Sequence, residues 1–107
     1  YILSNGFREL QEQKMRSAGV EGYFKKIVLS EDIGVHKPFP EIFYFAMSAT
    51  QSELHTSLMI GDNWKNDVEG AKNVGMGNVY YNIKGERGLP FKPGFDMRDW
   101  QDIASFL

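Results

Sequence analysis

Short apolar runs and longer amphipathic stretches alternate along the 107-residue chain. The short runs are rich in aliphatic and aromatic residues and are too short to form helices, so each one predicts a β-strand. The predicted strands are residues 1–3, 26–29, 57–60 and 79–81. Turn residues follow the first and the third of these runs, as expected where a strand leaves a sheet.

Two stretches between these strands have the apolar spacing of helices with one buried face. The first covers residues 7–18 and should end at Gly19, because glycine readily adopts the left-handed conformation found after a helix. The second covers residues 40–49, where Pro40 suits the first helical position. Both helices are expected to pack on a sheet.

The remainder of the chain predicts one more helix, a long loop and a short final helix. Asn66 or Asp67 can cap a helix that Gly75 can end. Residues 85–94 contain three glycines and two prolines, which predicts a loop. Residues 99–107 predict a short helix.

This order of elements predicts an α/β fold with a parallel sheet and helices on its faces. In such sheets, ligands bind beyond the carboxyl ends of the strands. The turns that begin at Ser4 and Gly61 follow predicted strands, and so does the loop that contains Lys37. We therefore expect one ligand site there. No internal repeat or domain boundary is evident, so residues 1–107 are interpreted as part of a single domain.

Composition narrows the possible functions. The formal net charge is −2, which argues against a surface for nucleic acid or anionic membranes, because both need clustered Lys and Arg. No apolar run approaches the roughly 18 residues of a membrane span. The chain contains no cysteine, which excludes disulfides and thiolate metal sites. These features fit a cytoplasmic protein, and we expect that location.

Ser4, Asn5 and Gly6 form a turn that can bind phosphate. The Ser4 hydroxyl and nearby backbone N–H groups can donate to phosphoryl oxygens, and glycine allows close approach. Taken alone, the turn is better explained as an ordinary connection. Lys37 lies between a glycine and a proline, where its ammonium can face phosphate or carboxylates. A single lysine is by default a solvated surface residue.

Asp62 directly follows an apolar run and Gly61, where a carboxylate faces the end of a sheet. Asp67 has a second explanation, because aspartate is a favoured helix cap. Two carboxylates at these positions, across a strand-to-helix turn, suit a hard cation such as Mg²⁺. Trp64 lies between them and is interpreted as a packing residue.

In this order, Leu3-Ser4-Asn5-Gly6, Lys37-Pro38 and Gly61-Asp62 with Asp67 resemble the second, third and fourth motifs of the haloacid dehalogenase superfamily. The resemblance extends to about Asn82. It implies a three-layer Rossmann-like parallel sheet. The Gly61-Asp62 pair implies the magnesium-dependent phosphatase branch rather than the metal-free dehalogenase branch.

The resemblance also implies a role for each matched residue. Ser4, with its neighbours Asn5 and Gly6, would bind the transferring phosphoryl group, and Lys37 would hold phosphate and nucleophile together. Asp62 would ligate Mg²⁺, and Asp67 would orient that metal site. The implied activity is hydrolysis of a small phosphorylated metabolite through an aspartyl-phosphate.

The first motif of the superfamily, Asp-x-Asp after an apolar strand, is absent from these residues. Its two aspartates supply the nucleophile and the general acid/base, so the isolated chain is predicted to be inactive. The chain also opens on Tyr1 rather than on methionine, and we expect that an upstream segment has been removed, together with the helical cap domain. The resemblance places the missing strand between the second- and fourth-motif strands. We expect the missing segment or a neighbouring chain to fill that position.

Two other functions stay open. A phosphomutase of the same superfamily would use the same residues, because the cap and the acid/base decide whether water or a sugar accepts the phosphoryl group. A non-catalytic regulatory module of the receiver type also combines acidic residues, Ser or Thr and a lysine. Its lysine should come late in the chain, whereas Lys37 precedes Asp62.

Overall fold

The computed structural model describes residues 1–105 and shows an α/β chain in which every strand pair is parallel. The prediction of a parallel α/β fold is therefore confirmed. The chain divides into two compact units, unit 1 at Tyr1–Ser52 and unit 2 from Glu53 onward. That both belong to one core domain stays a prediction.

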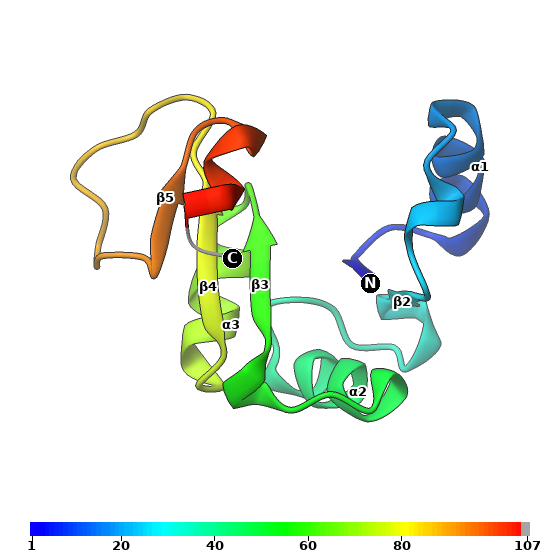
Figure 1. The fold of residues 1–107 in the computed structure, drawn as a ribbon. Coiled ribbons are helices and arrows are strands. Elements are labelled where there is room, and N and C mark those ends of the chain that lie inside the picture. The colour runs from blue at the N-terminus through cyan, green and yellow to red at the C-terminus, as the bar shows by residue number, and fades with distance from the viewer. Residues whose placement is uncertain (106–107) are drawn as a thin grey trace. The chain divides into compact units, whose positions relative to one another are not determined.

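Unit 1 contains a two-stranded sheet and two helices (Figure 1). Strand β1 (Ile2–Ser4) pairs with β2 (Ile27–Leu29), and the last residues of the two strands, Ser4 and Leu29, are partners. The carboxyl ends of both strands therefore lie next to each other. The loops that leave β1 and β2 therefore start from the same end of this sheet.

The helices of unit 1 begin and end close to the predicted positions. Helix α1 (Arg8–Ala18) ends at Gly19, whose φ of 70° is left-handed, as expected. Helix α2 (Pro40–Thr50) begins at the predicted proline. It ends at Gln51, which adopts a left-handed φ of 53° without being glycine.

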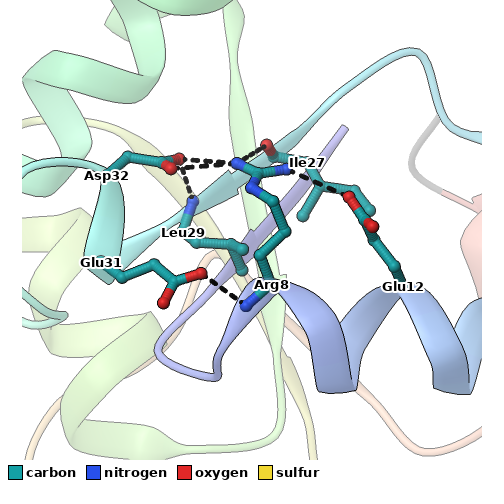
Figure 2. A network of polar contacts seen from close by, with 6 residues as sticks. All are labelled: Arg8, Glu12, Ile27, Leu29, Glu31 and Asp32. Carbon is teal, nitrogen blue, oxygen red and sulfur yellow. Dashed lines mark hydrogen bonds and ion pairs between the residues drawn. The ribbon is translucent and has the colours of Figure 1, made fainter.

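A network of polar contacts holds the start of α1 (Figure 2). Phe7 precedes the helix and offers no side-chain cap. Instead, the Arg8 N–H donates to Glu31 Oε1 at 2.7 Å, and the Arg8 guanidinium donates to both carboxylate oxygens of Asp32 at 3.0 and 3.1 Å. Asp32 also accepts from the Leu29 N–H at 2.9 Å. The turn after β2 thereby fixes the beginning of α1.

Unit 2 contains a three-stranded parallel sheet in the order β3-β4-β5 (Figure 1). Its strands are β3 (Leu58–Gly61), β4 (Gly77–Tyr81) and β5 (Phe95–Met97). Strand β5 was not predicted from the sequence. The loop before it carries no helix or strand, as predicted for residues 85–94. A 3₁₀ helix at Trp100–Ser105 replaces the predicted final helix, and residues 106–107 lie outside the described part of the chain.

The helix after β3 starts earlier than predicted. A π-helical segment, Trp64–Glu69, leads into helix α3 (Gly70–Asn73). The prediction that Asn66 or Asp67 caps this helix is wrong, because the Asn63 side chain accepts the Asn66 N–H at 2.9 Å. Asp67 lies inside the π-helical segment.

Each unit buries apolar side chains from both its strands and its helices. In unit 1 these are Met15, Val28, Leu29, Ile42, Phe43 and Ala46. In unit 2 they are Val68, Ala71, Met76, Val79, Tyr80 and Met97. Among residues 1–105, none of the helices combines the length and the apolar character needed to cross a membrane.

Strands β1 and β3 each have one strand neighbour among residues 1–105, β2 and β4 respectively. The other edge of each strand carries no partner strand in that range. An open edge presents backbone N–H and C=O groups that a further strand can bond.

Candidate functional site

The structure places Ser4 at the carboxyl end of β1, where the chain turns sharply. Its hydroxyl oxygen accepts the Gly6 N–H at 3.0 Å. This bond fixes the hydroxyl oxygen and leaves its hydrogen able to donate to a phosphoryl oxygen. Ser4 is half-buried and Asn5 is exposed. The turn predicted from Ser4-Asn5-Gly6 is present, and its phosphate-binding role stays a prediction.

Lys37 is 8% exposed, which is unusual for a lysine. Its ammonium donates to the Leu3 carbonyl at 3.1 Å, beside Ser4. The Lys37 N–H donates to Asn5 Oδ1 at 2.8 Å, and the Lys37 carbonyl accepts from Asn5 Nδ2 at 3.1 Å. The default explanation of a solvated surface lysine does not fit these contacts. Unit 1 thus brings the cation to the same end of β1 as the serine hydroxyl.

His36 adds one more contact to this loop. Its ring Nδ1 lies 2.8 Å from the Lys37 carbonyl, so Nδ1 must carry the hydrogen for this bond to form. The ring also packs edge-on against Phe39. The Lys37 carbonyl therefore accepts hydrogen bonds from both Asn5 Nδ2 and His36 Nδ1.

In unit 2, Asp62 and Asp67 both belong to the segment that follows β3. Asp62 is exposed, and Asp67 is 4% exposed. Asp67 Oδ2 accepts the Asn63 N–H at 3.2 Å, and the Asp67 N–H donates to the Asn63 carbonyl at 2.9 Å. These reciprocal bonds fold the π-helical segment back on the end of β3. Such π-helical turns occur frequently at functional sites.

Gly61 is required for this arrangement. A β-carbon added at Gly61 would overlap the carboxylate of Asp67. The buried carboxylate therefore packs directly on the backbone at the end of β3, next to the residue that precedes Asp62.

The donor set suits magnesium only in part. Mg²⁺ is usually bound through one or two carboxylates and keeps several water molecules. Asp62 offers an exposed carboxylate, and Asp67 is a buried one fixed by the Asn63 N–H. Within residues 1–105, no group of three or more His, Cys, Asp or Glu side chains is placed to hold a metal ion. The two carboxylates therefore fit Mg²⁺ as part of a ligand set.

Aromatic packing supports the π-helical segment. Trp64 packs on Tyr80 and Phe91, with ring centroids 5.2 and 4.7 Å apart, which agrees with its interpretation as a packing residue. The Tyr80 hydroxyl donates to Glu86 at 2.9 Å. Burial, and then the Glu86 carboxylate, raise the pKa of Tyr80 above its ordinary value, so this phenol stays a neutral donor.

The contacts of Arg8 with Glu31 and Asp32 were not predicted from the sequence. Two acidic residues after β2 and a basic residue at the start of α1 were a readable signal, because the carboxyl ends of parallel neighbours lie together. The double contact between Asn5 and Lys37 left no comparable signal. It joins residues 32 positions apart through an amide and a peptide group.

The comparisons with known proteins agree with these motifs. The model of the haloacid dehalogenase-like hydrolase family matches residues 1–80. Pyrimidine 5′-nucleotidase YjjG of Escherichia coli is 35% identical over 82 residues, which covers 76% of this chain and 36% of that protein. Glyceraldehyde 3-phosphate phosphatase of Pyrococcus abyssi is 35% identical over 80 residues, with 75% and 34% covered.

A solved structure shares the fold. The magnesium-bound crystal structure of the putative HAD-hydrolase YfnB from Bacillus subtilis matches with a TM-score of 0.90 and 27% identity. The match covers 98% of this chain and 46% of that one. The chain spans a third to a half, 33 to 50%, of the length of its curated relatives.

Proposed function

The chain belongs to the haloacid dehalogenase-like hydrolase family, and on that premise we propose that it is the C-terminal part of a magnesium-dependent phosphomonoesterase. The substrate would be a small phosphorylated metabolite. Two relatives carry names of phosphatases of small molecules, a pyrimidine 5′-nucleotidase and a glyceraldehyde 3-phosphate phosphatase. These names support the reaction class and leave the substrate of this protein open.

The observation that carries the proposal is the contact between the Lys37 ammonium and the Leu3 carbonyl at 3.1 Å. It brings a buried cation to the residue before Ser4, across 34 positions of sequence. Phosphoryl transfer to a carboxylate brings two anions together, so fixed positive charge and oriented donors must lower the barrier. A held lysine beside a serine hydroxyl supplies both.

The chemistry would divide among the residues as follows. The Ser4 hydroxyl would donate to a phosphoryl oxygen, and the Lys37 ammonium would offset the repulsion between phosphate and nucleophile. Asp62, with Asp67 behind it, would hold Mg²⁺. When bound, the ion would neutralise charge on the phosphoryl oxygens.

The nucleophile would come from a segment that precedes Tyr1 in the full-length protein or from another chain. An Asp-x-Asp motif is absent from the 107 residues. The open edge of β1 offers backbone groups with which such a strand can pair. The strand would present its first aspartate as the attacking group and its second as the general acid/base.

The Gly61-Asp62 pair favours a phosphatase over a metal-free dehalogenase. A dehalogenase needs no carboxylate for a cation at this position, whereas the Asp62 carboxylate is exposed and the Asp67 carboxylate is held by Asn63. The absence of a side chain at Gly61 leaves room for the Asp67 carboxylate, which also supports the phosphatase assignment.

Phosphate release tests the proposal. The full-length protein should release phosphate from members of a panel of small phosphomonoesters when Mg²⁺ is present, and EDTA should abolish that release. The isolated 107-residue chain should release none under the same conditions. Activity of the isolated chain would contradict the placement of the nucleophile outside it. A full-length protein that is inactive toward the whole panel would contradict the phosphatase assignment.

A further inference from the structure

The Asn5 side chain makes two hydrogen bonds to a single residue. Its Oδ1 accepts the Lys37 N–H at 2.8 Å, and its Nδ2 donates to the Lys37 carbonyl at 3.1 Å. Two bonds from one planar amide fix both the distance and the rotation of the backbone they contact. The Asn5 carbonyl also accepts the Ser30 hydroxyl at 3.2 Å. Asn5 thus connects the loop after β1 to the loop that carries Lys37.

These contacts leave little of the Asn5 amide for a phosphate. Its oxygen is an acceptor, which an anionic phosphate also is, so the two cannot bond. Its nitrogen carries two hydrogens, and one of them is directed at the Lys37 carbonyl. The amide as a whole is oriented by the Lys37 backbone. Asn5 is therefore better placed to act on Lys37 than on a ligand.

Few other residue types could make this pair of contacts. Alanine has neither the donor nor the acceptor, and serine has a single hydroxyl where two separate atoms are needed. Aspartate would set a second carboxylate oxygen against the Lys37 carbonyl, where a donor is needed. Glutamine carries the same amide on a side chain one methylene longer, which moves the amide out of register with the Lys37 backbone.

Lysine is the residue for which such support matters most. Its ammonium sits on a flexible four-carbon stem, so a fixed backbone is needed to deliver the charge to one place. In unit 1 the Lys37 N–H and carbonyl are bonded by Asn5, and the ammonium is held by the Leu3 carbonyl. A charge that is already in place stabilises a transition state without reorganising during the reaction.

We propose that Asn5 is a positioning residue that fixes the backbone of Lys37 and so sets the strength with which the lysine binds phosphate. The proposal rests on the proposed function, in which Lys37 contacts the phosphate. The role of Asn5 is exerted through Lys37, and its variants should matter only while that lysine is present.

The test measures binding of inorganic phosphate by isothermal titration calorimetry, with Mg²⁺ present, to the full-length protein and five variants. Asn5→Ala should weaken phosphate binding about 10-fold, and Lys37→Met should weaken it more. The double variant should bind within about 2-fold of Lys37→Met alone, because Asn5 then has no lysine to position. Ser30→Ala is the matched control, since it removes a contact to Asn5 but keeps the pair with Lys37, and it should stay within about 3-fold of wild type.

Asn5→Gln is a second variant that keeps the test valid if Asn5→Ala fails to fold. It keeps an amide and should weaken phosphate binding as alanine does, with the circular dichroism spectrum of the wild type. Unchanged affinity in folded Asn5→Ala and Asn5→Gln would overturn the proposal. So would a double variant in which the two losses multiply, because Asn5 would then act independently of Lys37.

Hydrogen exchange separates this proposal from the proposed function. The Lys37 amide hydrogen should exchange at least 10-fold faster in Asn5→Ala than in wild type or in Ser30→Ala. A wild-type protein that neither binds nor releases phosphate would overturn the proposed function, and the phosphate part of this proposal with it. Phosphate binding by wild type with unchanged Lys37 exchange in Asn5→Ala would overturn this proposal alone.

Discussion

The carboxylate of Asp67 occupies the space that a β-carbon on Gly61 would need. Gly61 ends β3, and Asp67 lies in the π-helical segment that follows. The contact explains why a glycine precedes Asp62. The absence of a side chain lets the buried carboxylate pack on the backbone and accept the Asn63 N–H.

Gly61→Ala should therefore displace the Asp67 carboxylate and destabilise the protein. Overpacked sites typically lose about 1–3 kcal/mol of unfolding free energy, and we expect a loss in that range by urea denaturation. Gly22→Ala is the matched control, because a β-carbon at Gly22 meets open space. It should change stability by less than about 0.5 kcal/mol. Equal effects of the two substitutions would contradict the packing described for Gly61.

The Arg8–Asp32 pair predicts a pH-dependent contribution to stability. The Leu29 N–H, and then the Arg8 guanidinium, lower the pKa of Asp32 below its ordinary value. A lowered pKa means that the carboxylate stabilises the folded chain above the unfolded pKa of about 4, and that this contribution is lost as pH falls through the folded pKa. The side chains are 41% and 25% exposed, so solvent screening keeps the contribution small.

A double-mutant cycle checks this pair. At pH 7, Asp32→Asn and Arg8→Gln should show a coupling of about 0.5–1 kcal/mol in the unfolding free energy. The coupling should shrink toward zero at low pH, once the pH has fallen through the lowered pKa of Asp32 and the carboxyl is protonated. A coupling that stays constant between the two pH values would show that charge does not contribute to the contact.

We expect the protein to tolerate replacement of Trp64 by phenylalanine. Its indole N–H is buried and has no hydrogen-bond partner among residues 1–105, while its ring packs on Tyr80 and Phe91. Trp64→Phe removes the unsatisfied donor and keeps an aromatic ring, so the unfolding free energy should change by less than about 1 kcal/mol. Trp64→Ala should lower it by about 3 kcal/mol or more. Equal losses in the two variants would contradict this prediction.

Local sequence signals predicted the regular elements where one residue decides the outcome. Gly19 ended α1 and Pro40 began α2 as expected, because the left-handed φ of glycine and the fixed φ of proline act locally. The cap before α3 was misassigned because Asn63, Asn66 and Asp67 are all good capping residues. Only the folded segment shows that Asn63 accepts the bond.

Strand β5 could not be predicted for a different reason. It has three residues and follows a Pro-Gly loop, so its own sequence gives almost no signal. It forms because β4 pairs with it in parallel and because the Asn78 side chain accepts the Gly94 N–H at 2.9 Å. Both contacts come from residues distant in sequence.

At the candidate site, too, some features could be predicted from the sequence and others could not. The residue types at Ser4, Lys37 and Asp62, and their place after strands, were readable from the sequence. The burial of Lys37 and its attachment to Asn5 and Leu3 were not, since they depend on how the loops meet after folding.

The most direct test of the account is the rate of phosphate release by the full-length protein carrying Lys37→Met or Asp62→Asn. We propose that both residues take part in phosphate release. Each variant should lose about 100-fold or more of kcat/KM relative to wild type, as expected when a single stabilising charge is removed, and each should keep the circular dichroism spectrum of the wild type. A folded variant of either residue with the wild-type rate would contradict the account.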